Sequence, residues 1–308
     1  MFNKYIRYFN QNKSKVIMIV IAVILAFILI QALNQFIEDE NKSRINELTN
    51  TVIIDKEIKD SVIKEGSTST EVAKKSKSMI DEFVKYCNTK NTKKAYELLS
   101  QDCKDILFPT EEDFINTYYN LVFNSYKEYE IENWVSNGNY ITYKIRYTND
   151  ALAQGGYKSE YTLEDYYTIV KQKDDYKLNI NKFVSREQIN KSQTKDNFSI
   201  NVVARENFID YQIYEVYFNN KNAYPVKTYD ESESSTWNVT DERGLEYLAF
   251  TNEIPDNNLR VESGVEKKIK IKYAKMYNLN RKISEIKFNN MYFENGVTKG
   301  LFSFDISI

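Results

Sequence analysis

The stretch YITYKIRY, from Tyr140 to Tyr147, alternates bulky side chains with polar ones. A period of two places alternate side chains on opposite faces of a strand, and strands favour Tyr, Ile and Thr. Similar stretches flank it, and the dipeptides Asn137-Gly138 and Asp174-Asp175 supply the tight turns between neighbours. The sequence therefore predicts a meander of four antiparallel strands, at about 129–132, 140–147, 161–171 and 176–183.

Three helical segments precede this meander. The first covers about 71–88 and has Met79, Ile80, Phe83 and Val84 on one face. The others cover about 92–101 and 111–123, and Thr110 with Asp113 has the spacing of a capping box at the start of the third. Helices followed by antiparallel strands predict an α+β layer in which three helices cover one face of a curved antiparallel sheet.

This order of elements resembles the nuclear-transport-factor-2-like superfamily over about residues 71–186. The resemblance rests on the segment FVKYCNTKNTKKAYELLSQDCK, from Phe83 to Lys104, followed by EEDFINTYY. Members of this superfamily often have a conical cavity, and some are isomerases or dehydratases that use Asp, Tyr and His there. The resemblance thus implies a cavity in which Asp165, Tyr166 and Tyr167 could supply an acid and a donor. Alternation instead points Tyr166 and Tyr167 to opposite faces of the sheet.

A second block of strands follows a polar connector, taken as a linker over 187–198. Turn residues separate its segments and no helical period interrupts them, which predicts an all-β sandwich over 199–308. The expected strands are 200–204, 211–219, 237–240, 246–251, 267–273, 283–288 and 301–306.

This block resembles an immunoglobulin-like extracytoplasmic domain of unknown function that many Gram-positive envelope proteins carry. The resemblance lies in the stretches NNKNAYPVKTYD, WNVTDERGLEYLAF and VESGVEKKIKIKYA. Its turn residues are Asn222 with Pro225, Asp241 with Gly244 and Tyr247, and Gly264.

The N-terminal region predicts a membrane anchor. Residues 16–37 carry no charge and are long enough to cross a bilayer as a helix. Basic residues precede them and acidic residues follow, so residues 1–15 are expected to be a cytoplasmic tail and the rest to lie outside. Residues 38–70 read as a stalk or linker with an interrupted amphipathic helix. We therefore expect a single-pass plasma-membrane protein; a cleaved signal peptide is the alternative.

Composition excludes several kinds of chemistry. The chain has no His, which removes the usual general base and the commonest metal ligand. A net charge of -2 provides no field that would attract nucleic acid, so no nucleic-acid partner is expected. Cys87 and Cys103 are the only cysteines, and two buried thiols or one disulfide both fit their spacing.

Short motifs give no catalytic, cofactor-binding or metal-binding residue. Ser61 to Lys64 and Ser192 to Lys195 match the S-x-x-K motif of penicillin-binding enzymes but lack its partner motifs. Asp230, Glu231 and Glu233 form an acidic loop without the spacing of a calcium site. We also expect no cofactor.

Three hypotheses for function follow. The first is a non-enzymatic interaction or scaffold protein of the bacterial cell envelope, with protein partners and self-association left open. The second is a structural part of a conjugative or type IV secretion-like assembly, whose assembly proteins are similar in having one span and an external nuclear-transport-factor-2-like domain. The third is a ligand-binding or enzymatic cavity in the first domain.

Overall fold

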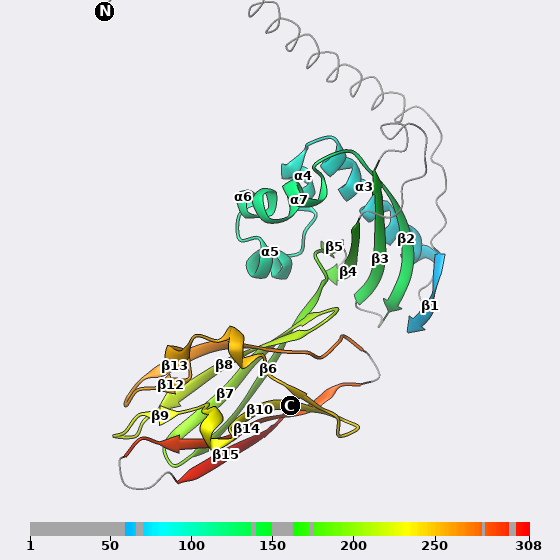
Figure 1. Ribbon diagram of the computed structural model, residues 1–308. Coiled ribbons are helices and arrows are strands. Elements are labelled where there is room, and N and C mark those ends of the chain that lie inside the picture. Colours follow the sequence, from blue (N-terminus) through cyan, green and yellow to red (C-terminus); the bar gives the residue numbers. More distant parts are fainter. Residues whose placement is uncertain are drawn as a thin grey trace, which may run out of the picture. The chain divides into compact units, whose positions relative to one another are not determined.

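The meander around Tyr140 is part of a five-stranded sheet in the computed structural model, which describes residues 59–65, 70–136, 140–149, 163–172, 175–278, 281–295 and 300–308 (Figure 1). The strands are β1 (Lys59–Glu65), β2 (Lys127–Ser136), β3 (Tyr140–Asn149), β4 (Leu163–Gln172) and β5 (Asp175–Asn179), in that spatial order. The four predicted strands pair antiparallel, whereas β1 pairs parallel with β2. Residues 59–65, predicted to belong to a helical stalk, are therefore a strand.

Helical elements occupy the chain between β1 and β2. They are α3 (Thr70–Asn88), α4 (Thr92–Glu97), α5 (Gln101–Leu107), α6 (Glu111–Phe114), the π-helical turn Ile115–Tyr119 and α7 (Asn120–Val122). The capping box predicted at Thr110 is confirmed, because its side chain accepts from Asp113 N while the Asp113 side chain accepts from Thr110 N. Helix α5 was not predicted separately: the expected helix 92–101 ends at Glu97, and Ser100 caps a new one.

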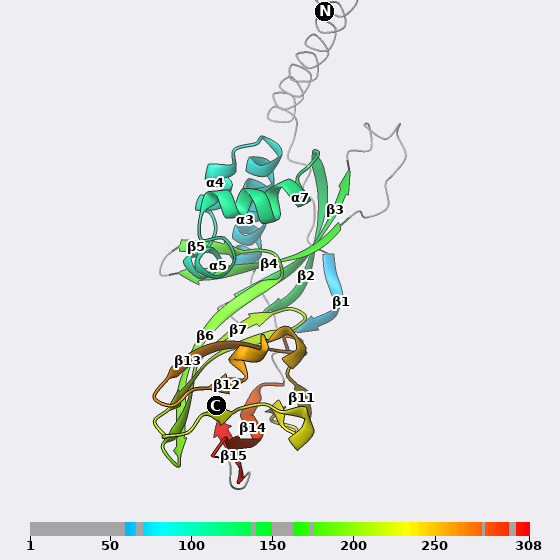
Figure 2. The same ribbon diagram turned by 60° about the vertical axis from the view of Figure 1, so that its left-hand side comes forward.

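The helices gather on one side of the sheet, as Figures 1 and 2 show. Apolar side chains from both layers form a first core, in which Phe83 of α3 packs edge-on against Phe114 and Tyr167. Cys87 and Cys103 are buried in it as free thiols, which decides between the two alternatives. Burial raises the pKa of Cys103 to about 12, so the thiol stays protonated and weakly reactive.

Two further antiparallel sheets follow. One has the order β13-β8-β7-β6, and in the other β11-β10-β14-β9-β12 form the path while β15 pairs with β14. The bounds are β6 (Phe183–Lys195), β7 (Phe198–Phe208), β8 (Gln212–Asn220), β9 (Val226–Lys227), β10 (Thr236–Asp241), β11 (Glu246–Leu248), β12 (Arg260–Val261), β13 (Glu266–Tyr273), β14 (Ile283–Phe293) and β15 (Leu301–Ser307). Each of the seven strands predicted here overlaps one of these, although β11 covers only the first half of the predicted strand 246–251.

A second core lies between these two sheets. Phe218 of β8 contacts Trp237 of β10 and Phe288 of β14, with ring centroids 5.7 Å and 5.4 Å away. The Trp237 indole N–H donates to Thr228 O over 2.9 Å, so this large buried side chain keeps no unsatisfied donor.

The polar connector expected before the second block is instead β6, a 13-residue strand. It pairs antiparallel with β7 and is the last strand of its sheet. Its side chains from Asn190 onward are exposed, so the strand shows no apolar alternation there.

The predicted fold class is corrected on three points. Strands dominate the described residues, the first sheet is mixed and not purely antiparallel, and the helical layer comprises more elements than the three helices expected. None of the helices within the described residues combines the length and the apolar character needed to cross a bilayer. The transmembrane prediction for residues 16–37 lies outside the described residues, and the single-pass anchor and plasma-membrane location built on it are not supported and are not retained.

Candidate functional site

Alternation along β4 separates the three residues that the sequence offered for chemistry. Asp165 and Tyr167 point into the first core and are 5% and 0% exposed, whereas Tyr166 is only half-buried. The expectation that Tyr166 and Tyr167 lie on opposite faces is therefore met. Asp165 and Tyr167 are joined in the core by Tyr118 and Tyr147, two residues that the sequence did not single out.

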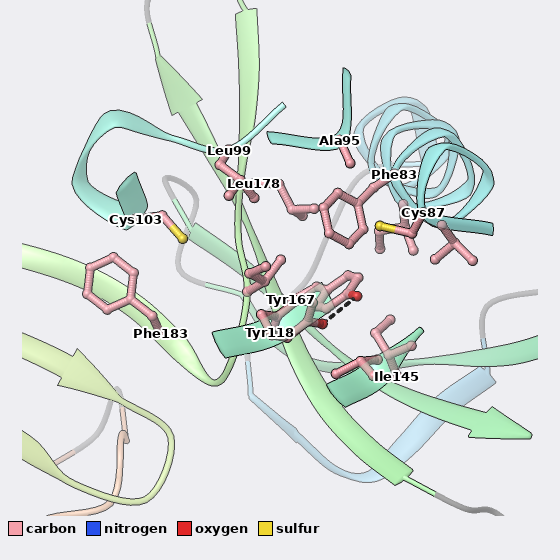
Figure 3. Close-up of a cluster of buried hydrophobic side chains, with 14 of the residues drawn as sticks. Phe83, Cys87, Ala95, Leu99, Cys103, Tyr118, Ile145, Tyr167, Leu178 and Phe183 are labelled. Carbon is pink, nitrogen blue, oxygen red and sulfur yellow. Dashed lines mark hydrogen bonds between the residues drawn. The ribbon is translucent and has the colours of Figure 1, made fainter. Parts of the chain in front are cut away.

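The three tyrosine hydroxyls form a chain that ends on the carboxylate. The Tyr118 hydroxyl lies 2.8 Å from the Tyr167 hydroxyl (Figure 3). Tyr118 donates to Asp165 Oδ2 over 2.7 Å, and the Tyr167 hydroxyl also bonds the Tyr147 hydroxyl. Each phenol has one proton to give. Since Tyr118 gives its proton to Asp165, Tyr167 donates to Tyr118 and Tyr147 donates to Tyr167.

Backbone amides complete the shell of the carboxylate. Tyr166 N donates to Oδ1 over 2.7 Å, Lys182 N donates to Oδ1 over 3.1 Å, and Asn181 N donates to Oδ2 over 3.2 Å. Together with Tyr118, Asp165 accepts four hydrogen bonds. This arrangement satisfies the polar atoms of a group that would otherwise be costly to bury.

The electrostatics of the cluster follow from its burial. Burial raises the pKa of Asp165 to about 6, while the bonds from Tyr118 and the three amides act in the opposite direction. Burial also raises the pKa of Tyr118, Tyr147 and Tyr167 well above the usual value for a phenol. The tyrosines therefore stay neutral at physiological pH and act as donors.

This cluster ties core elements together and offers no reaction centre. A general acid must reach the atom to which it gives its proton. Asp165 is enclosed, and its lone pairs are used by protein donors. Tyr118 comes from the helical layer, Tyr147 from β3, and Asp165 and Tyr167 from β4, so the network links helix to sheet.

Tyr118 reaches the sheet from a π-helical turn. Asn120 N donates to Ile115 O, a bond that spans five residues, within a segment predicted as an ordinary helix over 111–123. The wider turn holds Tyr118 between Phe114 and Phe108, at ring distances of 5.9 Å to each. Nothing in the local pattern INTYY distinguishes Tyr118 from Tyr119, which explains why the sequence did not identify it.

The other sequence candidates occupy ordinary structural positions. Ser192 and Lys195 lie three residues apart in β6, hence on opposite faces of the strand, and residues 61–64 lie within β1. In the acidic loop, Asp230 accepts from Ser232 N and from the Tyr292 hydroxyl. Across the described parts of the chain, no group of three acidic or cysteine side chains is placed to hold a metal ion.

Strand β13 alternates buried and outward-facing side chains. Ile269, Ile271 and Tyr273 are buried, while the lysines between them point outward. Lys268 pairs with Glu215 at 2.8 Å and Lys270 with Glu206 at 2.7 Å. These cations are neutralised within the sheet, which argues against a basic surface for anionic polymers.

A second constellation lies where several strands of the second core end. We call it the loop end; it comprises residues 196–197, 221–225 and 262–265. The buried side chain of Asn220 is its centre, because Asn220 Nδ2 donates to the carbonyls of Tyr224, Val261 and Glu262 over 2.9, 3.0 and 3.2 Å. Asn220 Oδ1 accepts from Asn222 N over 3.0 Å.

Further bonds join the three loops to one another. Asn222 Nδ2 donates to Asp196 O over 2.7 Å, and Ser263 Oγ donates to Asn222 O over 2.6 Å. Lys221 N donates to Asn197 O over 2.9 Å. The loops therefore form one connected surface, from which Tyr224 and Val265 project with exposed fractions of 51% and 37%. The sequence pointed to Asn222, Pro225 and Gly264 here but not to Asn220, which ends a strand that reads as regular.

Comparison of the chain with protein-family models, with curated proteins and with solved structures gave no match. Nothing outside the chain therefore identifies a nuclear-transport-factor-2-like or an immunoglobulin-like domain in it. Both resemblances stay predictions.

Proposed function

We propose that this chain is a non-enzymatic interaction protein that presents the loop end to a folded protein partner. The observation that carries the proposal is the connected set of three loops, held by Asn220, with the exposed side chains of Tyr224 and Val265 among mainly polar residues. Loops placed on a rigid scaffold are where binding residues concentrate.

The make-up of the loop end suits protein recognition. Its residues are mainly Asn, Ser, Gly, Lys, Tyr and acidic residues, and Tyr, Ser, Gly and Asn are the types enriched in antibody binding loops. A tyrosine ring supplies a large contact area with few rotatable bonds, and hot spots of interfaces are rich in Tyr. Because the loops are already bonded to one another, little ordering is required when a partner binds.

The enclosed carboxylate cluster gives the enzymatic hypothesis no support. Asp165 and the three tyrosines satisfy one another inside the core, and a substrate would have to displace those bonds. The secretion-assembly hypothesis depended on the membrane segment, and no contact within the described residues favours it.

Site-specific photo-crosslinking in the cells that make the protein tests the proposal. A photoreactive amino acid replaces Tyr224 in one full-length variant and Met276 in another. Met276 is 60% exposed and follows the opposite end of β13, so it reports non-specific contact at an exposed apolar position. We expect a discrete crosslinked protein from position 224 and not from position 276.

A second substitution on the same surface sharpens the result. Adding Val265→Asp to the variant with the probe at 224 should remove the crosslinked product, because a charge beside Tyr224 has to be desolvated when a partner binds. Equal products from positions 224 and 276, or a product that persists with Val265→Asp, would contradict a specific partner at the loop end. A product whose mass is that of two copies of the chain would identify the partner as the protein itself.

A further inference from the structure

The turn between β5 and β6 has an unfavourable backbone conformation. Asn181 and Lys182 have φ angles of 56° and 62°, in the left-handed region, and Phe183 N donates to Ile180 O over 3.2 Å. Left-handed backbone is costly for residues with a Cβ atom, and a lysine lacks the local hydrogen bonding that eases it for asparagine. A contact from outside the turn would offset this cost.

The Asp165 carboxylate provides that stabilisation. Its two oxygens accept the consecutive amides Asn181 N and Lys182 N, so the turn cradles the carboxylate as a backbone nest cradles an anion. The carboxylate itself belongs to β4 and is held from the other side by Tyr118. The turn is thus fixed by a group inside the first core.

The same turn holds the turn between β7 and β8. Ile209 N donates to Lys182 O over 3.0 Å, and Lys182 Nζ lies 2.6 Å from Asp210 Oδ2. Phe183 and Phe208 contact each other, with ring centroids 5.3 Å apart, and both belong to the first core. Both turns therefore depend on the position of Lys182, at the ends of strands that continue into the second core.

We propose that the ionised Asp165 carboxylate acts as a latch on the connection between the two cores, and that its protonation releases the β5–β6 turn and the β7–β8 turn. When the carboxyl is protonated, one oxygen remains a good acceptor, while the other carries an O–H group that faces the hydrogen-bond donors around it. The nest of two amides then loses its anion, and the left-handed turn loses the interaction that offsets its strain.

The surroundings of Asp165 contain no charge that would take over this role. The groups facing it are the hydroxyls of Tyr118, Tyr147 and Tyr167 and, from α5, the thiol of Cys103. All four are neutral below pH 9 because burial raises each pKa. The Lys182 ammonium is directed to Asp210 instead. The amide bonds from the turn lower the pKa of Asp165, which burial raises to about 6. A carboxyl that stays buried while the turn is released therefore has a pKa above this value, so protonation in mildly acidic conditions favours the released turn.

Hydrogen exchange of the full-length protein, read by mass spectrometry, tests the latch. Exchange of residues 180–183 and 207–211 is followed from about pH 5 to about pH 7.5, corrected for the intrinsic pH dependence and referenced to residues 200–204 of β7. We expect protection of both turns to rise together by about tenfold with pH, as the amide bonds to the carboxylate form. Protection that stays constant across this range would overturn the proposal.

Two variants separate a latch from a purely structural carboxylate. Asp165→Asn cannot ionise, so its turns should exchange at about pH 7.5 as fast as those of the natural protein at about pH 5. Tyr118→Phe keeps the carboxylate but removes a bond that lowers its pKa, so the midpoint of the change should move to higher pH. An unmoved midpoint in a folded Tyr118→Phe protein would contradict the proposal, even if Asp165→Asn failed to fold.

Discussion

Burial disfavours the ionised form of the Asp165 carboxylate, whereas four hydrogen-bond donors stabilise that form. Its pKa is higher in the folded protein, at about 6, than its ordinary value of 3.8, so the folded state binds the extra proton between these values. The contribution of Asp165 to stability is therefore greatest below about pH 4 and falls as the pH rises through about 6. The shift corresponds to at most ~3 kcal/mol.

This sign can be measured with Asp165→Asn, which does not titrate. The free energy of unfolding of the natural protein minus that of the variant should decrease by up to ~3 kcal/mol between about pH 4 and about pH 7. Other carboxylates titrate alike in both proteins and cancel in the difference. Urea unfolding at a series of pH values provides the comparison, and a difference that is flat or rises with pH would refute the assignment.

Within the described residues, the Tyr118 hydroxyl is the side-chain donor to Asp165, and it also bonds Tyr167. Tyr118→Phe should lower the free energy of unfolding by about 1–3 kcal/mol, because it leaves a buried acceptor with one donor fewer. Tyr224→Phe is the matched control: its ring is half exposed, and we expect a change within about 0.5 kcal/mol. Equal effects in a denaturant titration would show that the hydroxyl chain contributes little.

Sequence reasoning reached half of this residue cluster. The alternation in LEDYYTIV places Asp165 and Tyr167 together and sends Tyr166 away, and the structure agrees. Tyr118 and Tyr147 were out of reach, because their contribution depends on how helix and sheet pack. The chain has 25 tyrosines, and the local sequence does not show which of them donates to a distant carboxylate.

Among the elements, β6 shows where pattern reasoning fails. An edge strand with exposed polar side chains lacks the period of two that a half-buried strand shows, so residues 187–198 were predicted to be a linker. The sequence did contain one signal, the pair Asp196-Asn197, because Asp and Asn tolerate left-handed backbone. In the structure both residues adopt it, with φ angles of 50° and 57°, as the central residues of a tight hairpin turn require. Read as a hairpin signal, this pair would have predicted a strand on each side.

The turn after β10 was predicted better, because its residues act locally. Asp241 Oδ1 accepts from Arg243 N and Leu245 N, both over 3.0 Å, and Gly244 has a φ angle of 82°. The theme of Asp followed three residues later by Gly therefore specifies this turn. Helix boundaries were predicted less well where short helices follow one another, as at α4 and α5.

Gly244→Ala should destabilise the protein by about 1–2 kcal/mol, because a Cβ atom disfavours left-handed backbone. No atom lies within 4 Å of that added Cβ, so steric crowding does not contribute. Gly300→Ala is the control: its added Cβ also meets open space, and its φ lies outside the positive range. We expect the control to change the free energy of unfolding by less than about 0.5 kcal/mol, and similar losses in both variants would refute the backbone argument.

At the scale of the whole molecule, one hairpin belongs to both cores. Strands β6 and β7 pair from Phe183 with Phe208 at one end to Lys195 with Phe198 at the other. Phe183 and Phe208 lie in the first core, whereas Phe198 lies in the second. The two cores cannot therefore unfold independently without breaking this hairpin or its turns.

The sequence predicted the strands of each core better than the connection between the cores. Strand positions follow from local periodicity, and each of the eleven predicted segments overlaps a strand. The parallel strand β1, the edge strand β6 and the turn held by Asp165 depend on partners distant along the chain, so no window of sequence contains them. The loop end was predicted in part. Its turn residues can be recognised from the local sequence, whereas the central position of Asn220 depends on contacts with residues distant along the chain.

Differential scanning calorimetry is the most direct test of a protein whose two cores are joined through Asp165 and the β6–β7 hairpin. At about pH 7.5 the natural protein should unfold in one transition, with calorimetric and van't Hoff enthalpies that agree. Asp165→Ala, which removes the support of the β5–β6 turn, should separate this into two transitions. Two independent transitions in the natural protein, or a single undivided transition in the variant, would contradict the connection described above.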